Sequence, residues 1–141
     1  LMKSWYMFFF QLPFLPAWLA SLGGYRRFAE AMRGTANPGS FSDEDIEAYI
    51  HAWQKPDALD SMINWYRAAF QHAEFGGPVE VEVPTLILWG EQDRFLEAGM
   101  ATQSKKYCRS VDVKFFPHAT HWLQHDEPEA VNKEIEAFIK P

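Results

Sequence analysis

The pattern of the chain changes near Gly76-Gly77-Pro78, and this change limits the folds available to its 141 residues. Before this turn signal, apolar residues recur at three- and four-residue spacing, which predicts helices. After it, short apolar runs alternate with helical patterns, which predicts an α/β layer built on a parallel sheet. We therefore expect a helical region over residues 1–77 and an α/β region over residues 78–141.

Two helices are expected in the middle of the helical region. The stretch "FSDEDIEAYIHAW" has Ser42 followed three residues later by Asp45, which is the spacing of a capping box, so a helix should begin there and run to about Trp53. A second helix should follow Pro56, because apolar residues recur there on one helical stripe. That stripe consists of Leu59, Met62, Ile63, Tyr66 and Phe70.

The α/β region contains two expected strands, "VEVEVPTLILWG" and "SVDVKFFP", separated by a helix from about Leu96 to Tyr107. A last amphipathic helix is expected in "EPEAVNKEIEAFI", with Asp126 as its cap and Pro128 in its first turn. Its buried stripe should be Val131, Ile135 and Phe138. Two strands leave a sheet edge unpaired, so we expect upstream polypeptide to supply further strands.

Composition excludes several kinds of partner. The formal net charge is −6 and the basic residues are scattered, so neither nucleic acid nor an anionic membrane surface is expected to bind. The single cysteine, Cys108, favours a reducing compartment, and we expect a cytoplasmic protein. The apolar opening is interrupted by Pro13 and Pro16, so this segment does not imply a membrane span, although an upstream anchor is left open.

Candidate catalytic side chains follow each expected strand. Asp93 comes just after the first, and "HATHWLQHDEPE" follows the second. In parallel α/β sheets, functional groups gather outside the carboxyl ends of the strands. A carboxylate that accepts from one histidine nitrogen leaves the other nitrogen to activate water or a nucleophile. Asp93 could equally be a turn residue or a helix cap, and His118 and His125 are expected to have no catalytic role.

The residues resemble a known family. "PTLILWGEQDRFL" followed by "ATHWLQHDEPEAVNKEIEAFI" is similar to the C-terminal part of α/β-hydrolase fold proteins, and "HW" after a small residue is typical of the epoxide hydrolase and haloalkane dehalogenase branch. "SWYMFFFQLP" and "AWQKPDALDSMINWYRAAF" resemble the two halves of the epoxide hydrolase lid, as in proteins similar to epoxide hydrolase 4. The resemblance implies a partial α/β-hydrolase fold, with a helical lid over 1–77 and the last part of the core over 78–141.

The resemblance also implies roles for individual residues. Asp93 would orient His121, and His121 would be the base. Tyr6 and Tyr66 would bind the epoxide oxygen, although Tyr6 could be lid packing and Tyr66 a core residue. Three further side chains are expected to contact the substrate: Trp5, Phe10 and Trp122.

The sequence departs from the family in one respect, because it contains no G-x-D-x-G, G-x-S-x-G or H-G-x-P segment. The nucleophilic aspartate is therefore expected on upstream polypeptide, and the chain alone should be inactive. The implied partners are a small-molecule epoxide and the missing N-terminal half of the fold, and no metal or organic cofactor is needed. Two alternatives stay open: a haloalkane or haloacid dehalogenase of the same fold, and a non-catalytic domain that binds another protein.

Overall fold

The chain forms two compact units in a computed structural model that describes residues 5–71 and 80–140. We call them the helical unit (residues 1–34 and 41–75) and the sheet unit (residues 35–40 and 76–141). Residues 35–40 thus group with the sheet unit, although they connect two helices of the helical unit in sequence. Assignment of residues 1–77 and 78–141 to a lid and a hydrolase core stays a prediction.

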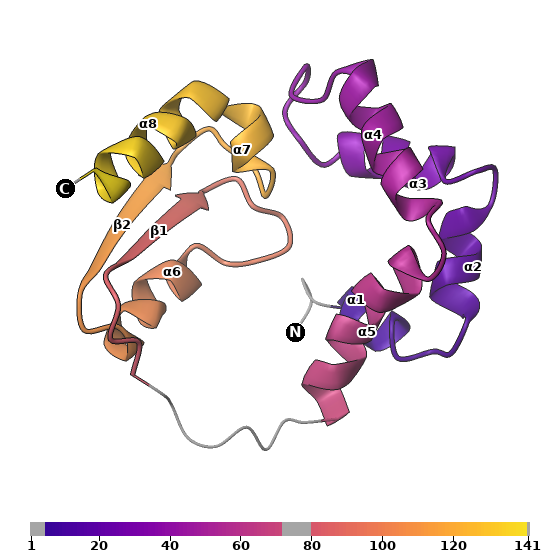
Figure 1. Cartoon of the computed structure of the whole chain (residues 1–141), viewed down its shortest axis with the longest axis horizontal. Coiled ribbons are helices and arrows are strands. Elements are labelled where there is room, and N and C mark those ends of the chain that lie inside the picture. Colours follow the sequence, from indigo (N-terminus) through magenta and orange to yellow (C-terminus); the bar gives the residue numbers. More distant parts are fainter. Residues whose placement is uncertain (1–4, 72–79, 141) are drawn as a thin grey trace. The chain divides into compact units, whose positions relative to one another are not determined.

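The described part of the helical unit consists of helices joined by short turns, as the sequence predicted (Figure 1). The first ends before Pro13, and Pro16 occupies the first turn of the second. No helix in the described ranges has the length and apolar composition needed to cross a membrane. The helices are α1 (Trp5–Phe9), α2 (Leu15–Ser21), α3 (Arg26–Arg33), α4 (Asp43–Trp53) and α5 (Ala58–Gln71).

Helices α4 and α5 match the expected positions. The Ser42 hydroxyl accepts from the Asp45 backbone N–H at 3.0 Å, and the Asp45 carboxylate accepts from the Ser42 N–H at 2.9 Å, so the predicted capping box is confirmed. On α5, Leu59 and Ile63 are buried as expected. Met62 is 54% exposed, so its assignment to the buried stripe was wrong.

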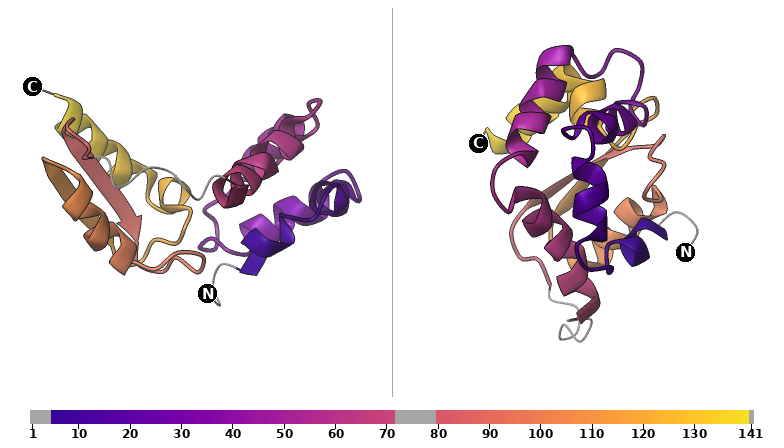
Figure 2. Two further views of the ribbon diagram at one scale, coloured as in Figure 1. Left: turned by 90° about the horizontal axis from the view of Figure 1, so that it is seen from below. Right: turned by 90° about the vertical axis from the view of Figure 1, so that its right-hand side faces the viewer.

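The sheet unit is built on strands β1 (Thr85–Gly90) and β2 (Val111–Phe116), which pair in parallel. The register aligns Thr85 with Val111 and Gly90 with Phe116, so both strands end at the same level. Helices α6 and α8 lie on opposite sides of the strand pair (Figure 2), which confirms the α/β class. The helical elements of this unit are α6 (Gly99–Ser104), the 3₁₀ turn η1 (Lys105–Tyr107), α7 (Leu123–Asp126) and α8 (Pro128–Ile139).

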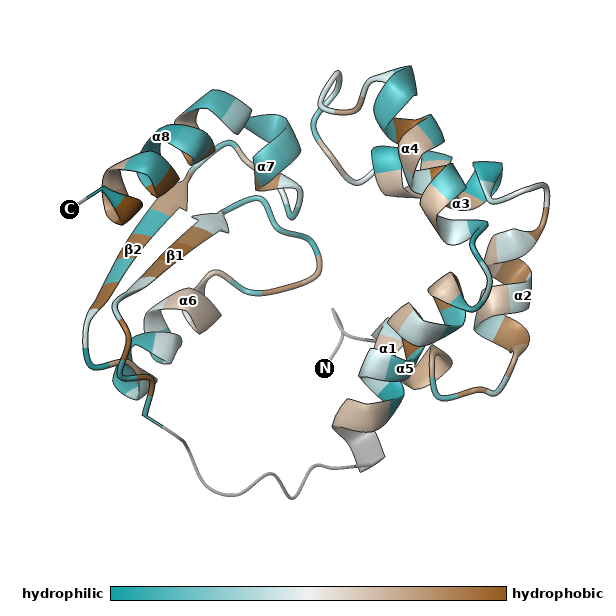
Figure 3. Cartoon of the chain, viewed as in Figure 1, coloured by the Kyte–Doolittle hydropathy of each residue, from teal (hydrophilic) through white to brown (hydrophobic). Residues whose placement is uncertain are grey.

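The core of the sheet unit lies between the strands and α8, where Phe116, Ala119 and Val131 are buried and Leu88 packs against them. Figure 3 shows apolar and polar bands alternating along β2. Pro128 is in the first turn of α8, as expected. Ile135 and Phe138 are 42% and 37% exposed, so the predicted buried stripe of α8 is only partly correct.

Two expectations about helix ends were wrong. The predicted helix from Leu96 to Tyr107 begins only at Gly99, because the Asp93 carboxylate accepts from the backbone N–H groups of Phe95 and Leu96 and holds them in a turn. Asp126 does not cap α8. The residue at the cap position is Glu127, which makes no side-chain cap bond. Asp126 instead ends α7, and its carboxylate accepts from the Thr120 N–H.

Candidate functional site

The loops that follow β1 and β2 are held against each other by backbone hydrogen bonds. Glu91 N–H donates to the Phe116 carbonyl at 3.0 Å, and Gln92 N–H donates to the Ala119 carbonyl at 2.9 Å. Gly90 permits this approach, since a Cβ on Gly90 would lie 2.6 Å from the Ala119 carbonyl oxygen and closer still to that of Thr120. The end of β1 therefore requires a residue without a side chain.

These two loops place Asp93 beside His121. The Nδ1 atom of His121 lies 2.9 Å from Oδ2 of Asp93, while Oδ1 of Asp93 accepts from Phe95 N–H at 2.7 Å and Leu96 N–H at 2.9 Å. Only 7% of the Asp93 side chain is exposed, against 37% for His121. A buried carboxylate that already accepts two backbone bonds is fixed in place, so it also fixes the ring it contacts.

The geometry of the pair suits a general base. With Asp93 accepting at Nδ1, the neutral ring carries its hydrogen there, and Nε2 keeps a lone pair that can accept a proton. The rings of Phe95 and Trp122 stand edge-on to the His121 ring, with centroids 5.1 and 5.3 Å away. These apolar walls restrict the motion of the imidazole while leaving part of it accessible.

The second expected pair, Tyr6 and Tyr66, lies within the helical unit. Their ring centroids are 5.9 Å apart and the rings are nearly perpendicular. Phe10 contacts both, at 5.8 Å from Tyr6 and 5.0 Å from Tyr66. The structure thus brings together Asp93 with His121, and Tyr6 with Tyr66 and Phe10.

Polar side chains connect α5 to the turn that follows α1, close to the tyrosines. The guanidinium of Arg67 donates to the carbonyls of Phe10 at 2.9 Å and Leu12 at 2.8 Å. The Gln11 amide donates to the Tyr66 carbonyl at 3.4 Å. Arg67 follows Tyr66 directly, so these bonds link the helix that carries Tyr66 to the turn after the helix that carries Tyr6.

Two of the expected substrate contacts, Trp122 and Trp5, remain to be placed. Trp122 donates its indole N–H to the Thr35 hydroxyl at 2.8 Å, which holds the ring next to His121. The backbone of Trp5 is in α1, and its side chain lies outside the described part of the structure.

The sequence did not reveal Asp126 as a member of this region. Its carboxylate accepts from the Thr120 N–H and hydroxyl, each at 2.6 Å, and from residues of the 35–40 loop. Burial raises the pKa of Asp126, but the hydrogen bonds from Ser40, Thr120 and Asn37 outweigh this effect, so the pKa lies below its ordinary value. The stretch "NPGS" over residues 37–40 is typical of a turn and could have marked this loop, but it does not identify the partner of the loop.

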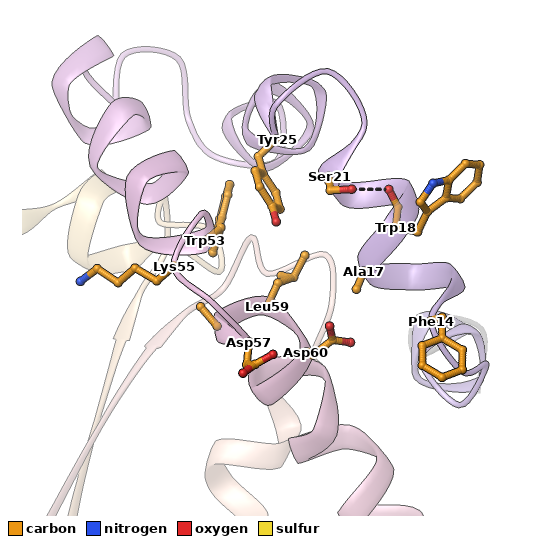
Figure 4. A pocket seen from close by; sticks show the side chains of 11 residues that line it. Phe14, Ala17, Trp18, Ser21, Tyr25, Trp53, Lys55, Asp57, Leu59 and Asp60 are labelled. Atoms are coloured by element: carbon orange, nitrogen blue, oxygen red, sulfur yellow. Dashed lines mark hydrogen bonds between the residues drawn. The ribbon is translucent and has the colours of Figure 1, made fainter.

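A separate pocket of about 280 Å³ lies in the helical unit (Figure 4). Tyr25, Trp53, Asp57 and Asp60 are among its lining residues, and none of the expected site residues belongs to it. Asp60 is in the first turn of α5, where a carboxylate stabilises the positive end of the helix dipole. The acidic side of this pocket is therefore accounted for by the helix, and we place the candidate site at Asp93 and His121.

Comparison with known proteins identifies the family. The family model described as alpha/beta hydrolase fold matches residues 9–128. The chain belongs to the α/β-hydrolase fold family. Members place catalytic groups in loops after the strands of a parallel sheet, which is where Asp93 and His121 lie.

Curated relatives of this α/β-hydrolase chain match nearly all of it. It is 38% identical over 146 residues to epoxide hydrolase 4 of Homo sapiens, covering 99% of this chain and 40% of that protein. It is 34% identical over 139 residues to the AB hydrolase superfamily protein YfhM of Bacillus subtilis, covering 99% of this chain and 49% of that protein. The chain thus spans half or less of the length of these relatives.

Solved structures agree with the fold. The Bacillus megaterium epoxide hydrolase in complex with an inhibitor superposes with a TM-score of 0.81 at 23% identity, covering 98% of this chain and 51% of that one. Wild-type Cfl2 from Burkholderia cenocepacia gives a TM-score of 0.79 at 23% identity, covering 99% of this chain and 48% of that one. At such identities the likeness supports the α/β-hydrolase fold alone.

Proposed function

We propose that this chain is the C-terminal portion of an epoxide hydrolase, which opens an epoxide to a vicinal diol through an alkyl-enzyme ester. The observation that carries the proposal is the hydrogen bond between the buried Asp93 carboxylate and His121. This pair can activate water, but the described residues include no nucleophile aligned with it. Since the chain spans half or less of its curated relatives, we place the nucleophilic aspartate on polypeptide outside this sequence.

The first step uses the tyrosines. The upstream aspartate attacks one epoxide carbon, so that an ester C–O bond forms and the epoxide C–O bond breaks. Tyr6 and Tyr66 donate hydrogen bonds to the departing oxygen, and one of them supplies its proton. A phenol suits this role because its pKa of about 10 keeps it protonated at neutral pH, yet well below the pKa of an alkoxide. Phe10, which contacts both rings, would form an apolar wall beside the substrate.

The second step uses the histidine. Nε2 of His121 removes a proton from water, and the water oxygen adds to the ester carbonyl carbon. The bond between that carbon and the alkyl oxygen then breaks, the proton passes from His121 to the leaving alkoxide, and the diol departs. The aspartic acid formed in this step then gives up its proton, which restores the tyrosine that lost its proton in the first step. Asp93 stabilises the imidazolium that exists between the two proton transfers. We assign further substrate contacts to Trp5 and Trp122.

The relatives support an epoxide as the substrate. Epoxide hydrolase 4 of Homo sapiens and epoxide hydrolase 3 of Xenopus tropicalis each match 99% of this chain at 38% identity. Two tyrosines whose rings lie 5.9 Å apart also suit one oxygen atom that accepts from both hydroxyls.

The test uses the full-length protein, which includes the polypeptide outside this sequence. It is incubated with styrene oxide and, separately, with a chloroalkane, and diol formation and chloride release are measured. We expect diol and no chloride. Replacing Tyr6 and Tyr66 together by Phe should lower the rate of epoxide opening by at least about 100-fold, because two donors to the developing charge are lost. Tyr107→Phe, a tyrosine of the sheet unit, is the matched control and should leave the rate unchanged. Chloride release without diol would replace the proposal with a dehalogenase, and a double variant with most of its activity would remove the tyrosines from the mechanism.

A further inference from the structure

Asp126 joins two segments that are distant in the sequence. Its Oδ1 atom accepts from Asn37 N–H at 3.1 Å and from the Ser40 hydroxyl at 2.5 Å, while Oδ2 accepts from the N–H and hydroxyl of Thr120. We call residues 35–40 the clasp loop. The carboxylate thus accepts four bonds, two from the clasp loop and two from the residue that precedes His121.

The clasp loop reaches both sides of His121. Besides its bonds to Asp126, the Asn37 side-chain amide donates to the His118 carbonyl at 2.7 Å, and the Thr35 hydroxyl accepts from the Trp122 indole at 2.8 Å. Residues 118, 120 and 122 are therefore all held, directly or through Asp126, by one loop. His121 itself is left to bond Asp93.

The clasp loop has a defined shape. Ser40 N–H donates to the Asn37 carbonyl at 3.1 Å, with Pro38 and Gly39 between them and a φ of +86° at Gly39, as in a type II turn. Arg33, at the end of α3, donates to the Ser42 carbonyl at 3.3 Å and to the Asp43 carboxylate at 2.7 Å. These bonds close the base of the loop. A rigid loop presents its donors to Asp126 with little loss of conformational freedom.

Asp126 does not act as the cap of α8, because Glu127 holds the cap position. Its partners instead surround the base histidine. We propose that Asp126 is a positioning residue for His121: by fastening the clasp loop to Thr120, it fixes where Nε2 meets the water that hydrolyses the ester. This inference rests on the proposed function and assigns a role within its second step.

Replacing Asp126 by Asn tests the inference with little change in shape. The Asn amide keeps one acceptor oxygen but puts an NH₂ group opposite donors, so at least one of the two pairs of bonds is lost. Displacement of a catalytic group by a fraction of an ångström slows the step it serves while leaving other steps intact. We expect ester hydrolysis to slow about tenfold or more and ester formation to change less than twofold.

The experiment is a single-turnover reaction of the full-length protein with styrene oxide. Samples are quenched at intervals, and the mass of the undigested protein is measured. The rise of the protein-plus-epoxide mass gives the rate of ester formation, and its decay gives the rate of hydrolysis. Asp112→Asn is the matched control, since Asp112 is an exposed carboxylate on β2. Ser40→Ala, which removes one of the four donors, is a milder second variant that should slow hydrolysis severalfold.

The outcomes separate the possible roles of Asp126. The positioning role is supported if the ester decays more slowly in Asp126→Asn, and to a lesser degree in Ser40→Ala, while the rate of ester formation is unchanged. Unchanged decay overturns the inference. A loss of folded protein that lowers the amount of ester, with the same decay rate in the folded fraction, also overturns it, because the role is then structural only. If the wild-type protein forms no ester, the proposed function fails and the inference falls with it.

Discussion

The close approach of the loops after β1 and β2 makes Gly90 a sensitive backbone position of the candidate site. In Gly90→Ala the new methyl group would lie 2.6 Å from the Ala119 carbonyl oxygen and closer to that of Thr120. Both atoms belong to backbone, which cannot rotate away as a side chain can. The loop before His121 would have to retreat by roughly 1 Å to restore ordinary van der Waals contact.

The cost follows from the contacts that this retreat disturbs. Overpacking of this kind typically costs about 1–3 kcal/mol. The hydrogen bond from Gln92 N–H to the Ala119 carbonyl, 2.9 Å long, would also be stretched or broken, for about 1 kcal/mol more. We therefore expect the free energy of unfolding to fall by about 2–4 kcal/mol. Because His121 moves with the loop, its activity in ester hydrolysis should fall about 100-fold.

Urea denaturation of Gly90→Ala, of a control variant and of the wild type measures the predicted loss of unfolding free energy. Gly99→Ala is the matched control, because Gly99 is the first residue of α6 and a Cβ there has nothing within 4 Å. That variant should be as stable as the wild type or slightly more so, by less than about 1 kcal/mol. If Gly90→Ala and Gly99→Ala unfold at the same urea concentration, the close approach of the two loops does not require glycine at position 90.

Two further predictions concern Arg67 and Asp126. Arg67→Lys should lower the free energy of unfolding by about 1–2 kcal/mol, because one ammonium cannot span the carbonyls of Phe10 and Leu12. The variant should also slow epoxide opening more than ester hydrolysis. Equal slowing of both steps would contradict a role of Arg67 in holding the tyrosines. The pKa of Asp126 is lower in the folded protein than in the unfolded chain, so its contribution to stability is complete above the unfolded pKa of about 3.9 and is lost as the pH falls through the folded pKa. Urea denaturation from pH 6 to pH 3 should therefore show a steeper loss of stability for the wild type than for Asp126→Asn, and parallel curves would exclude this linkage.

The elements of the fold could be predicted from local patterns. The capping box at Ser42 and the apolar run before Gly90 identified α4 and β1, since both signals depend on residues near each other in the chain. The meeting of Asp93 and His121 followed from a topological rule, because parallel neighbouring strands end at the same edge.

Other features depended on contacts that no local pattern encodes. Asp126 was expected to cap α8, but it binds Asn37 and Ser40, which are 89 and 86 residues away in the sequence. An amphipathic stripe likewise shows which face of a helix can be buried, and not whether a neighbour covers it. Ile135 on α8 and Met62 on α5 lie on such stripes and are exposed.

The central claim is that His121 activates the water that hydrolyses an alkyl-enzyme ester. The most direct measurement is the intact mass of His121→Ala protein after mixing with styrene oxide, next to His51→Ala as a control at an exposed histidine of α4. We expect His121→Ala to retain a mass increase equal to one epoxide long after the wild type and the control have returned to their starting masses. Continued turnover to diol by His121→Ala, with no retained adduct, would contradict it.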